Sequence, residues 1–202
     1  CKWVDGNRLI AWNIMMNLSS EFGVSNEYER ELRKLFRNVE FRKAMSHAMD
    51  RDTMGQSVAR GPFFHPHAGG FVAGSPFHNF DDSIYYAYNV AGANSILDGL
   101  GLEDSDGNGI RNLPNGGDDL VIDVLYNSLR STDNKLADAS VSMFEAIGMK
   151  PVLKPSDNTD AFTDSGNWSM YIAREHWVVA TKNIGDRLPT TSQNPAWHRD
   201  NE

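Results

Sequence analysis

The segment Phe36–Arg51, FRNVEFRKAMSHAMDR, is the most informative part of this chain. Its apolar residues recur at helical spacing and predict a helix with one face toward the core. That face consists of Phe41, Ala44, Met45, Ala48 and Met49. Asp50 follows, and its short carboxylate predicts the N-cap of the next helix, because it can accept from the free amides of the first turn. On physical grounds alone, the segment predicts an amphipathic helix, a turn and a second helix.

Outside this segment, helices and strands alternate. An apolar run at 9–14 predicts an opening strand, and helical spacing at 28–36 predicts a helix before the segment. Alternating apolar residues at 120–126, a helical stripe at 136–147 and an apolar pair at 152–153 predict a right-handed β-α-β crossover. Gly148 suits the left-handed end of the crossover helix. Alternation at 168–172 predicts a further strand, so the expected fold is an α/β sheet with helices on its faces.

Composition limits the classes of function. The chain has 202 residues, 40% of them hydrophobic, which suits one globular domain. Its net charge of -8 and pI of about 5.2 argue against nucleic acid as a partner, because phosphate binding needs a concentrated positive surface. No apolar run reaches the roughly 18 residues of a membrane span. Cys1 is the only cysteine; we interpret it as a domain boundary, with a lipid-bearing N-terminus as the alternative.

The segment and several later motifs resemble one family. The segment resembles the signature Phe-Arg-x-x-x-Phe/Val-Arg-x-Ala-x-x-x-Ala-x-Asp-Arg of the large extracytoplasmic solute-binding proteins of ABC transporters, the oligopeptide- and dipeptide-binding type known as family 5. The matching residues are Phe36, Arg37, Phe41, Arg42, Ala44, Ala48, Asp50 and Arg51. Family-like pieces follow in order at 60–62, 88–101, 104–109 and 143–149. The resemblance covers residues 11–177.

The resemblance implies a fold, a location and a mechanism. Residues 1–202 are expected to form a single lobe, of the type II periplasmic-binding-protein kind with a mixed sheet, excised from a longer two-lobed protein. Such a lobe closes by a hinge around a peptide or another small polar solute and presents it to the membrane subunits of an ABC importer. The resemblance therefore implies a periplasmic or cell-surface protein, monomeric and not an enzyme. The alternatives are a stand-alone small-molecule or protein-interaction domain and, after it, a hydrolase.

Two stretches supply the candidate solute-binding residues. In peptide-binding relatives an Asp after the last strand pairs with the peptide's amino terminus, and the comparable stretch 171–177 lacks that Asp pattern. Glu175 could replace it, whereas Arg174 would suit an anionic solute, so a sugar or an opine-like solute stays open beside a peptide. The irregular stretch 63–82 is long enough to be either a cleft loop or a surface loop packed by its own aromatics. The candidates are Arg174, Glu175, His176, Trp177, Phe64 and His65.

A metal site is the weaker expectation. Residues 104–109, DSDGNG, match the front half of a calcium-binding loop, with Asp104, Asp106 and Asn108 as oxygen ligands. The twelfth position is Asn115, where a bidentate Glu is needed, so a structural turn is preferred over weak calcium binding. The pair His65 and His67 lacks the partners of a transition-metal site. No cofactor other than this possible calcium is expected.

Overall fold

The computed structural model describes residues 10–58, 86–114 and 117–176. The elements in chain order are β1 (Ile10–Met16), α1 (Glu27–Arg37), α2 (Val39–Ala48), α3 (Arg51–Val58), α4 (Val90–Gly99), β2 (Val121–Asn127), α5 (Ser131–Glu145), β3 (Lys150–Ser156), α6 (Thr159–Ser165) and β4 (Met170–His176). Within these ranges, no helix is long and apolar enough to cross a membrane.

The four strands form one mixed sheet in the order β1-β4-β2-β3. β2 runs parallel to β3 and to β4, and β1 is antiparallel to β4. The predicted crossover is confirmed, since α5 joins the parallel strands β2 and β3. Gly148, at φ 72°, takes the left-handed conformation that the sequence predicted there. The carboxyl ends of β2, β3 and β4 therefore meet the amino end of β1 at one edge, called here the carboxyl edge.

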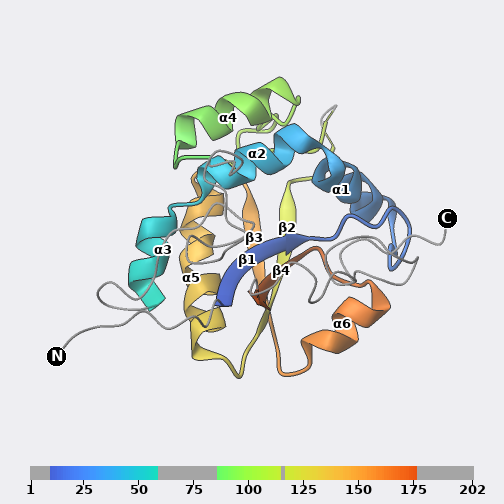
Figure 1. Cartoon of the computed structure of the whole chain (residues 1–202). Helices are drawn as coiled ribbons and strands as arrows, with labels where there is room; N and C mark the ends of the chain where they lie inside the picture. The colour runs from blue at the N-terminus through green and yellow to red at the C-terminus, as the bar shows by residue number, and fades with distance from the viewer. Residues whose placement is uncertain (1–9, 59–85, 115–116, 177–202) are drawn as a thin grey trace.

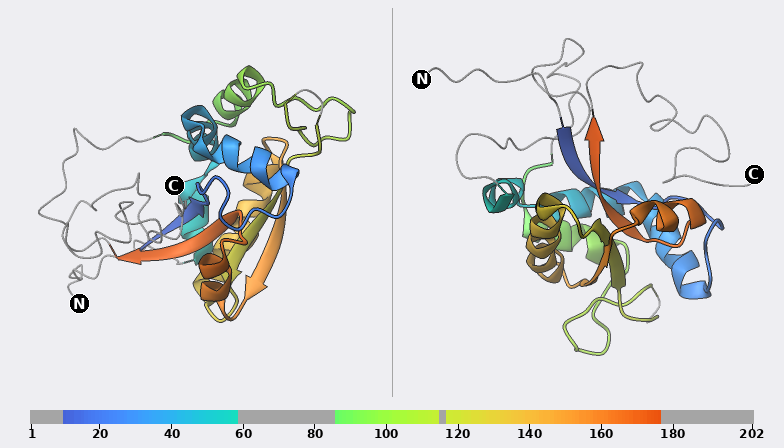
Figure 2. Two further views of the ribbon diagram at one scale, coloured as in Figure 1. Left: turned by 90° about the vertical axis from the view of Figure 1, so that its right-hand side faces the viewer. Right: turned by 90° about the horizontal axis from the view of Figure 1, so that it is seen from below.

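β1 and β4 project beyond this edge as a two-stranded ribbon. β4 pairs with β2 only at Met170 and Tyr171, whereas it pairs with β1 along its whole length, up to His176 opposite Ile10. Both strands leave the body of the domain together (Figure 2). The end of β4 is thus held by β1 alone.

The helices cover the sheet in layers. α4 packs on α2 at one end of the molecule, α3 lies beside α5, and α5 and α6 flank the strands on opposite sides (Figure 1). The largest fully buried apolar side chains come from both helices and strands. They include Phe36, Phe41, Leu97, Phe144, Ile147 and Ile172. The helices and the sheet thus share one hydrophobic core, which supports the strands that end at the carboxyl edge.

The signature segment contains the end of α1 and all of α2, in agreement with the separate helical stripes predicted at 28–36 and 41–49, and Asn38 separates the two helices. The backbone N–H of Asn38 donates to Leu35 at the end of α1, and its side chain accepts from the Glu40 amide to begin α2. The prediction that Asp50 caps the next helix is confirmed: it accepts from the Thr53 amide at 3.0 Å, just ahead of α3.

Candidate functional site

The carboxyl edge gathers strand ends and helix beginnings. β2 leads into α5 through residues 128–130, and β3 leads into α6 through 157–158. In open α/β sheets, ligands bind in the crevice outside the carboxyl ends of the strands. The first of these loops is joined to the last residue of β3 by a hydrogen bond from the Ser128 amide to the Ser156 carbonyl at 2.9 Å. At the tip of the β2–α5 loop, Leu129 leaves 78% of its surface exposed.

Trp12 and Asp133 meet on the α5 side of this edge. The indole Nε1 of Trp12, in β1, donates to Oδ1 of Asp133, in the first turn of α5, at 2.9 Å. Asp133 is completely buried, and its Oδ2 has no hydrogen-bond partner in the described part of the chain. Arg130 Nη1 lies 3.6 Å from that oxygen and forms a loose ion pair. Arg174 is directly opposite Trp12 in the strand register and is exposed.

The other face of the ribbon carries neutral polar groups. The Tyr171 hydroxyl, in β4, lies 3.2 Å from the Thr159 hydroxyl at the start of α6. Asn13 is opposite Ala173 in the register, and its buried Oδ1 has no hydrogen-bond partner among the described residues. An acceptor oxygen removed from water without a partner costs free energy. The carboxyl edge therefore presents an exposed arginine and two partly buried aromatic side chains, Trp12 and Tyr171, over buried polar groups; aromatic surface with a few polar groups is typical of sites for polar organic molecules.

The solute-binding candidates from the sequence fall into two groups, those in β4 and those outside the described residues. Arg174, Glu175 and His176 lie in β4 where it projects past the sheet, and the structure describes the side chain of Arg174 only. Trp177, Phe64 and His65, like the stretch 63–82, lie outside the described residues. The solute-binding role of all six stays a prediction.

Sequence reasoning did not find Trp12 or Asp133. The two residues are 121 positions apart, and no local motif links them. Trp12 appeared only as part of an apolar opening strand. The signal that could have found Asp133 is its place after a predicted strand, at the start of the crossover helix.

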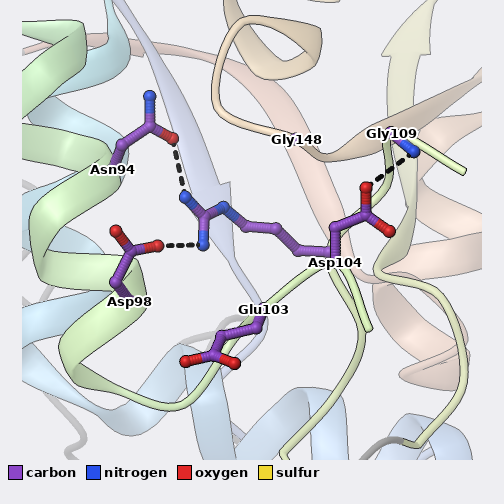
Figure 3. Close-up of a pocket in the computed structure, with 7 residues that line it drawn as sticks. Asn94, Asp98, Glu103, Asp104, Gly109 and Gly148 are labelled. Atoms are coloured by element: carbon purple, nitrogen blue, oxygen red, sulfur yellow. Dashed lines mark hydrogen bonds and ion pairs between the residues drawn. The ribbon is translucent and has the colours of Figure 1, made fainter. Parts of the chain in front are cut away.

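A second group of polar residues lies at the opposite end of the sheet. A pocket of about 300 Å³ there is lined by residues of α4 and of the loop before β2 (Figure 3). The guanidinium group of Arg111 uses most of its hydrogen-bond donors within the lobe. It donates to Asp98 at 2.6 Å, to Asn94 at 2.9 Å and to the Ile147 carbonyl at 2.9 Å. It also donates to the Leu102 carbonyl. Arg111 thus ties α4 to the end of α5.

The turn at 104–109 borders this pocket. Asp104 accepts from the backbone amides of Gly109 at 2.9 Å and Gly107 at 2.8 Å, and these bonds, led by that from Gly109, lower the pKa of its carboxyl group. Asn108 donates to Asp106 at 3.1 Å. The described residues contain no group of three or more His, Cys, Asp or Glu side chains that could hold a metal. Calcium binding by Asp104, Asp106 and Asn108 stays a prediction.

The mixed sheet, the flanking helices and the open carboxyl edge define one lobe of a type II periplasmic-binding-protein fold. The chain belongs to the bacterial extracellular solute-binding proteins, family 5, whose middle region matches residues 2–192. This membership confirms the family that the sequence resembles, a class of extracellular solute-binding proteins.

Known relatives include sugar-binding and peptide-binding proteins. The chain is 35% identical over 201 residues to the periplasmic alpha-galactoside-binding protein of Rhizobium meliloti (strain 1021), a match that covers 96% of the chain and 29% of that protein. The structure of the periplasmic binding protein MelB from Agrobacterium fabrum C58, in complex with stachyose, superposes with a TM-score of 0.91 at 31% identity, and covers 96% of the chain and 30% of MelB. The oligopeptide-binding protein OppA (TM-score 0.72, 23% identity, 86% of this chain and 27% of OppA) shares the fold. The chain thus spans less than a third of each relative's length.

Proposed function

We propose that this chain is the mobile lobe of a two-lobed solute-binding protein that captures an α-galactoside oligosaccharide for an ABC importer. The observation that carries the proposal is the match, over 96% of the chain, to an alpha-galactoside-binding protein. A structural neighbour of TM-score 0.91 in complex with stachyose supports the same class of solute. The membrane subunits of the importer are the proposed partners, and the protein acts as a monomer.

The mechanism proposed is closure about a hinge. The β1 and β4 ribbon leaves the sheet at the carboxyl edge and is suited to connect this lobe with the remainder of the protein (Figure 2). Solute enters between the lobes, each lobe supplies part of its contacts, and closure removes it from water. The solute favours the closed state only by as much as it binds that state more tightly. One lobe alone should therefore bind weakly.

The chemistry of the carboxyl edge favours a sugar over a peptide. A neutral oligosaccharide presents many hydroxyl groups and apolar ring faces, which suit neutral hydrogen-bonding groups and aromatic side chains. Trp12 supplies a partly buried indole at this edge, and the Tyr171 hydroxyl supplies a neutral hydrogen-bonding group on the other face of the ribbon. The stretch 171–177 lacks the Asp pattern of peptide-binding relatives. A peptide is the second candidate, because OppA shares the fold.

Thermal unfolding tests this proposal. The full-length protein is heated with stachyose, with an oligopeptide or without a solute, and the isolated 202-residue chain is run in parallel. Binding to the folded state raises the midpoint temperature. We expect stachyose to raise it in the full-length protein, the oligopeptide to leave it unchanged, and the isolated chain to respond little. A rise with the oligopeptide alone would replace the sugar by a peptide, and an equal rise in the isolated chain would contradict the two-lobed mechanism.

A further inference from the structure

We propose that Trp12 is the aromatic side chain on which a sugar ring of the solute stacks, and that Asp133 is the positioning residue that holds its indole. This inference rests on the proposed function and assigns a part of the site to named residues. Neither residue belongs to a sequence motif that indicated binding, and their contact exists only in the folded protein.

The position of Trp12 places it where the solute would enter. Counting from the pairs Val124–Met170 and Leu125–Tyr171, the last residue of β2, Asn127, is level with Ala173 of β4. Trp12 is opposite Arg174, one residue further along the ribbon. It is therefore the first described β1 side chain beyond the end of β2. It is also only partly buried, at the rim of the hydrophobic core.

Trp12 also has a fixed orientation. Its indole rests against the rim of the hydrophobic core, and Nε1 donates to Asp133 at 2.9 Å. The acceptor stands on the first turn of α5, a helix of 15 residues that packs on β2, β3 and β4. The hydrogen bond therefore fixes the orientation of the indole ring relative to α5 and the sheet. An aromatic surface held in its bound orientation loses little conformational entropy when a ligand stacks on it.

The surroundings of the Asp133 carboxylate fit the role of holding the indole better than a role in stability alone. Its side chain is fully buried, yet its Oδ2 has no hydrogen-bond partner among the described residues and only a 3.6 Å contact with Arg130. A buried carboxylate with so few partners costs stability. A buried group that is left partly unsatisfied in a folded protein calls for a reason beyond packing. Holding the indole of Trp12 is the use that the structure indicates.

Binding of stachyose to the full-length protein tests the role of Trp12. Isothermal titration compares the unaltered protein with Trp12→Ala and with Trp168→Phe. Trp168 is a matched control, because it is 5% exposed, lies just before β4 begins and has no hydrogen-bond partner for its Nε1 within the described ranges. We expect Trp12→Ala to weaken binding about tenfold, the effect of losing one aromatic contact, and Trp168→Phe to leave it unchanged.

A double-mutant cycle tests the role of Asp133. Trp12→Phe keeps an aromatic ring but removes the N–H, so the hydrogen bond to Asp133 is absent in this variant. We expect Asp133→Ala to weaken stachyose binding several-fold in the unaltered protein and to have little further effect in Trp12→Phe. Asp133→Asn keeps an acceptor oxygen and should retain most of the affinity. A purely structural role would give the same loss in both backgrounds.

The outcomes separate this inference from the proposed function. If the unaltered protein binds stachyose and Trp12→Ala binds it equally well, the stacking role of Trp12 is overturned while the sugar function stands. If Asp133→Ala costs as much in Trp12→Phe as in the unaltered protein, the positioning role is overturned. If the unaltered, folded protein binds no stachyose, the sugar function fails and this inference fails with it. Circular dichroism of each variant checks that it folds.

Discussion

At the residue scale, Tyr28 is a hydrogen-bonding bridge between a helix and the sheet. It stands in α1, and its hydroxyl donates to the Val121 carbonyl at 2.6 Å and accepts from the Val121 amide at 2.8 Å. Val121 is the first residue of β2. A side chain from α1 therefore fixes the point at which the central parallel strand begins. Burial raises the pKa of the Tyr28 hydroxyl to about 12.

We predict that Tyr28→Phe lowers the free energy of unfolding by about 1 kcal/mol at neutral pH, because these hydrogen bonds are lost. The raised pKa means that the folded protein holds this proton more tightly than the unfolded chain. The contribution is therefore fully present below pH 10, the ordinary pKa, and is lost as the pH rises toward 12. Urea unfolding at pH 8 and between pH 10 and 12 measures both effects.

The control for this prediction is Tyr88→Phe. Tyr88 is 50% exposed, so removal of its hydroxyl should leave stability unchanged. Equal losses in the two variants would contradict the bridging role of Tyr28. An unaltered protein that loses no more stability than Tyr28→Phe between pH 10 and 12 would contradict the effect of the raised pKa.

At the element scale, the loop after β1 and the end of α6 meet backbone to backbone. Gly23 has φ 75°, and a Cβ added to it would lie 2.3 Å from the carbonyl carbon of Gly166, the C-cap of α6. The Gly166 carbonyl also accepts from Asn17 at 3.1 Å and from buried Arg33 at 3.0 Å. Little freedom remains for this junction to move. It holds the end of β1 against the turn that leads into β4.

We predict that Gly23→Ala destabilises the protein by about 2–4 kcal/mol, from left-handed strain and from the clash with a backbone that cannot yield. Gly101→Ala is the matched control, since Gly101 has the same φ of 75° with no atom within 4 Å of an added Cβ. It should cost only the conformational strain, about 1 kcal/mol. Denaturant midpoints for both variants make the comparison. Equal losses of stability in the two variants would show that the close approach of Gly23 to Gly166 adds nothing to the cost of the substitution.

The elements also show what the sequence could predict. The strand at 121–127, helix α5 and the crossover to β3 follow from hydrophobic period, because each buries one face on the core. The two successive helices α1 and α2 also follow from their apolar stripes, whereas the capping of both by Asn38 was not predicted, because a cap leaves no mark on the hydrophobic period. The contact between Trp12 and Asp133 could not be predicted, because it depends on how two distant elements pack.

At the scale of the whole molecule, the arrangement of the core and the β1 and β4 ribbon bears on both the fold and the proposed closure. The sheet and the helices share one hydrophobic core, whereas β4 beyond Tyr171 is paired with β1 alone. Closure about such a ribbon can move the lobe as one body and leave its core intact. The Trp12 and Asp133 contact lies where ribbon and core meet. The same hydrogen bond that orients the indole thus also links the ribbon to α5.

Closure also predicts the fate of Leu129, which is 78% exposed on the loop between β2 and α5 at the carboxyl edge. If the facing lobe covers this side chain in the closed state, Leu129→Asp must bury a carboxylate on closure, and burial of a charge is costly. We predict that Leu129→Asp weakens stachyose binding by the full-length protein at least several-fold, and reduces the fall in radius of gyration that stachyose produces in small-angle scattering. Val39→Asp is the control, because Val39 is 53% exposed at the start of α2, away from the carboxyl edge. If both variants close and bind like the unaltered protein, Leu129 lies outside the closing surface.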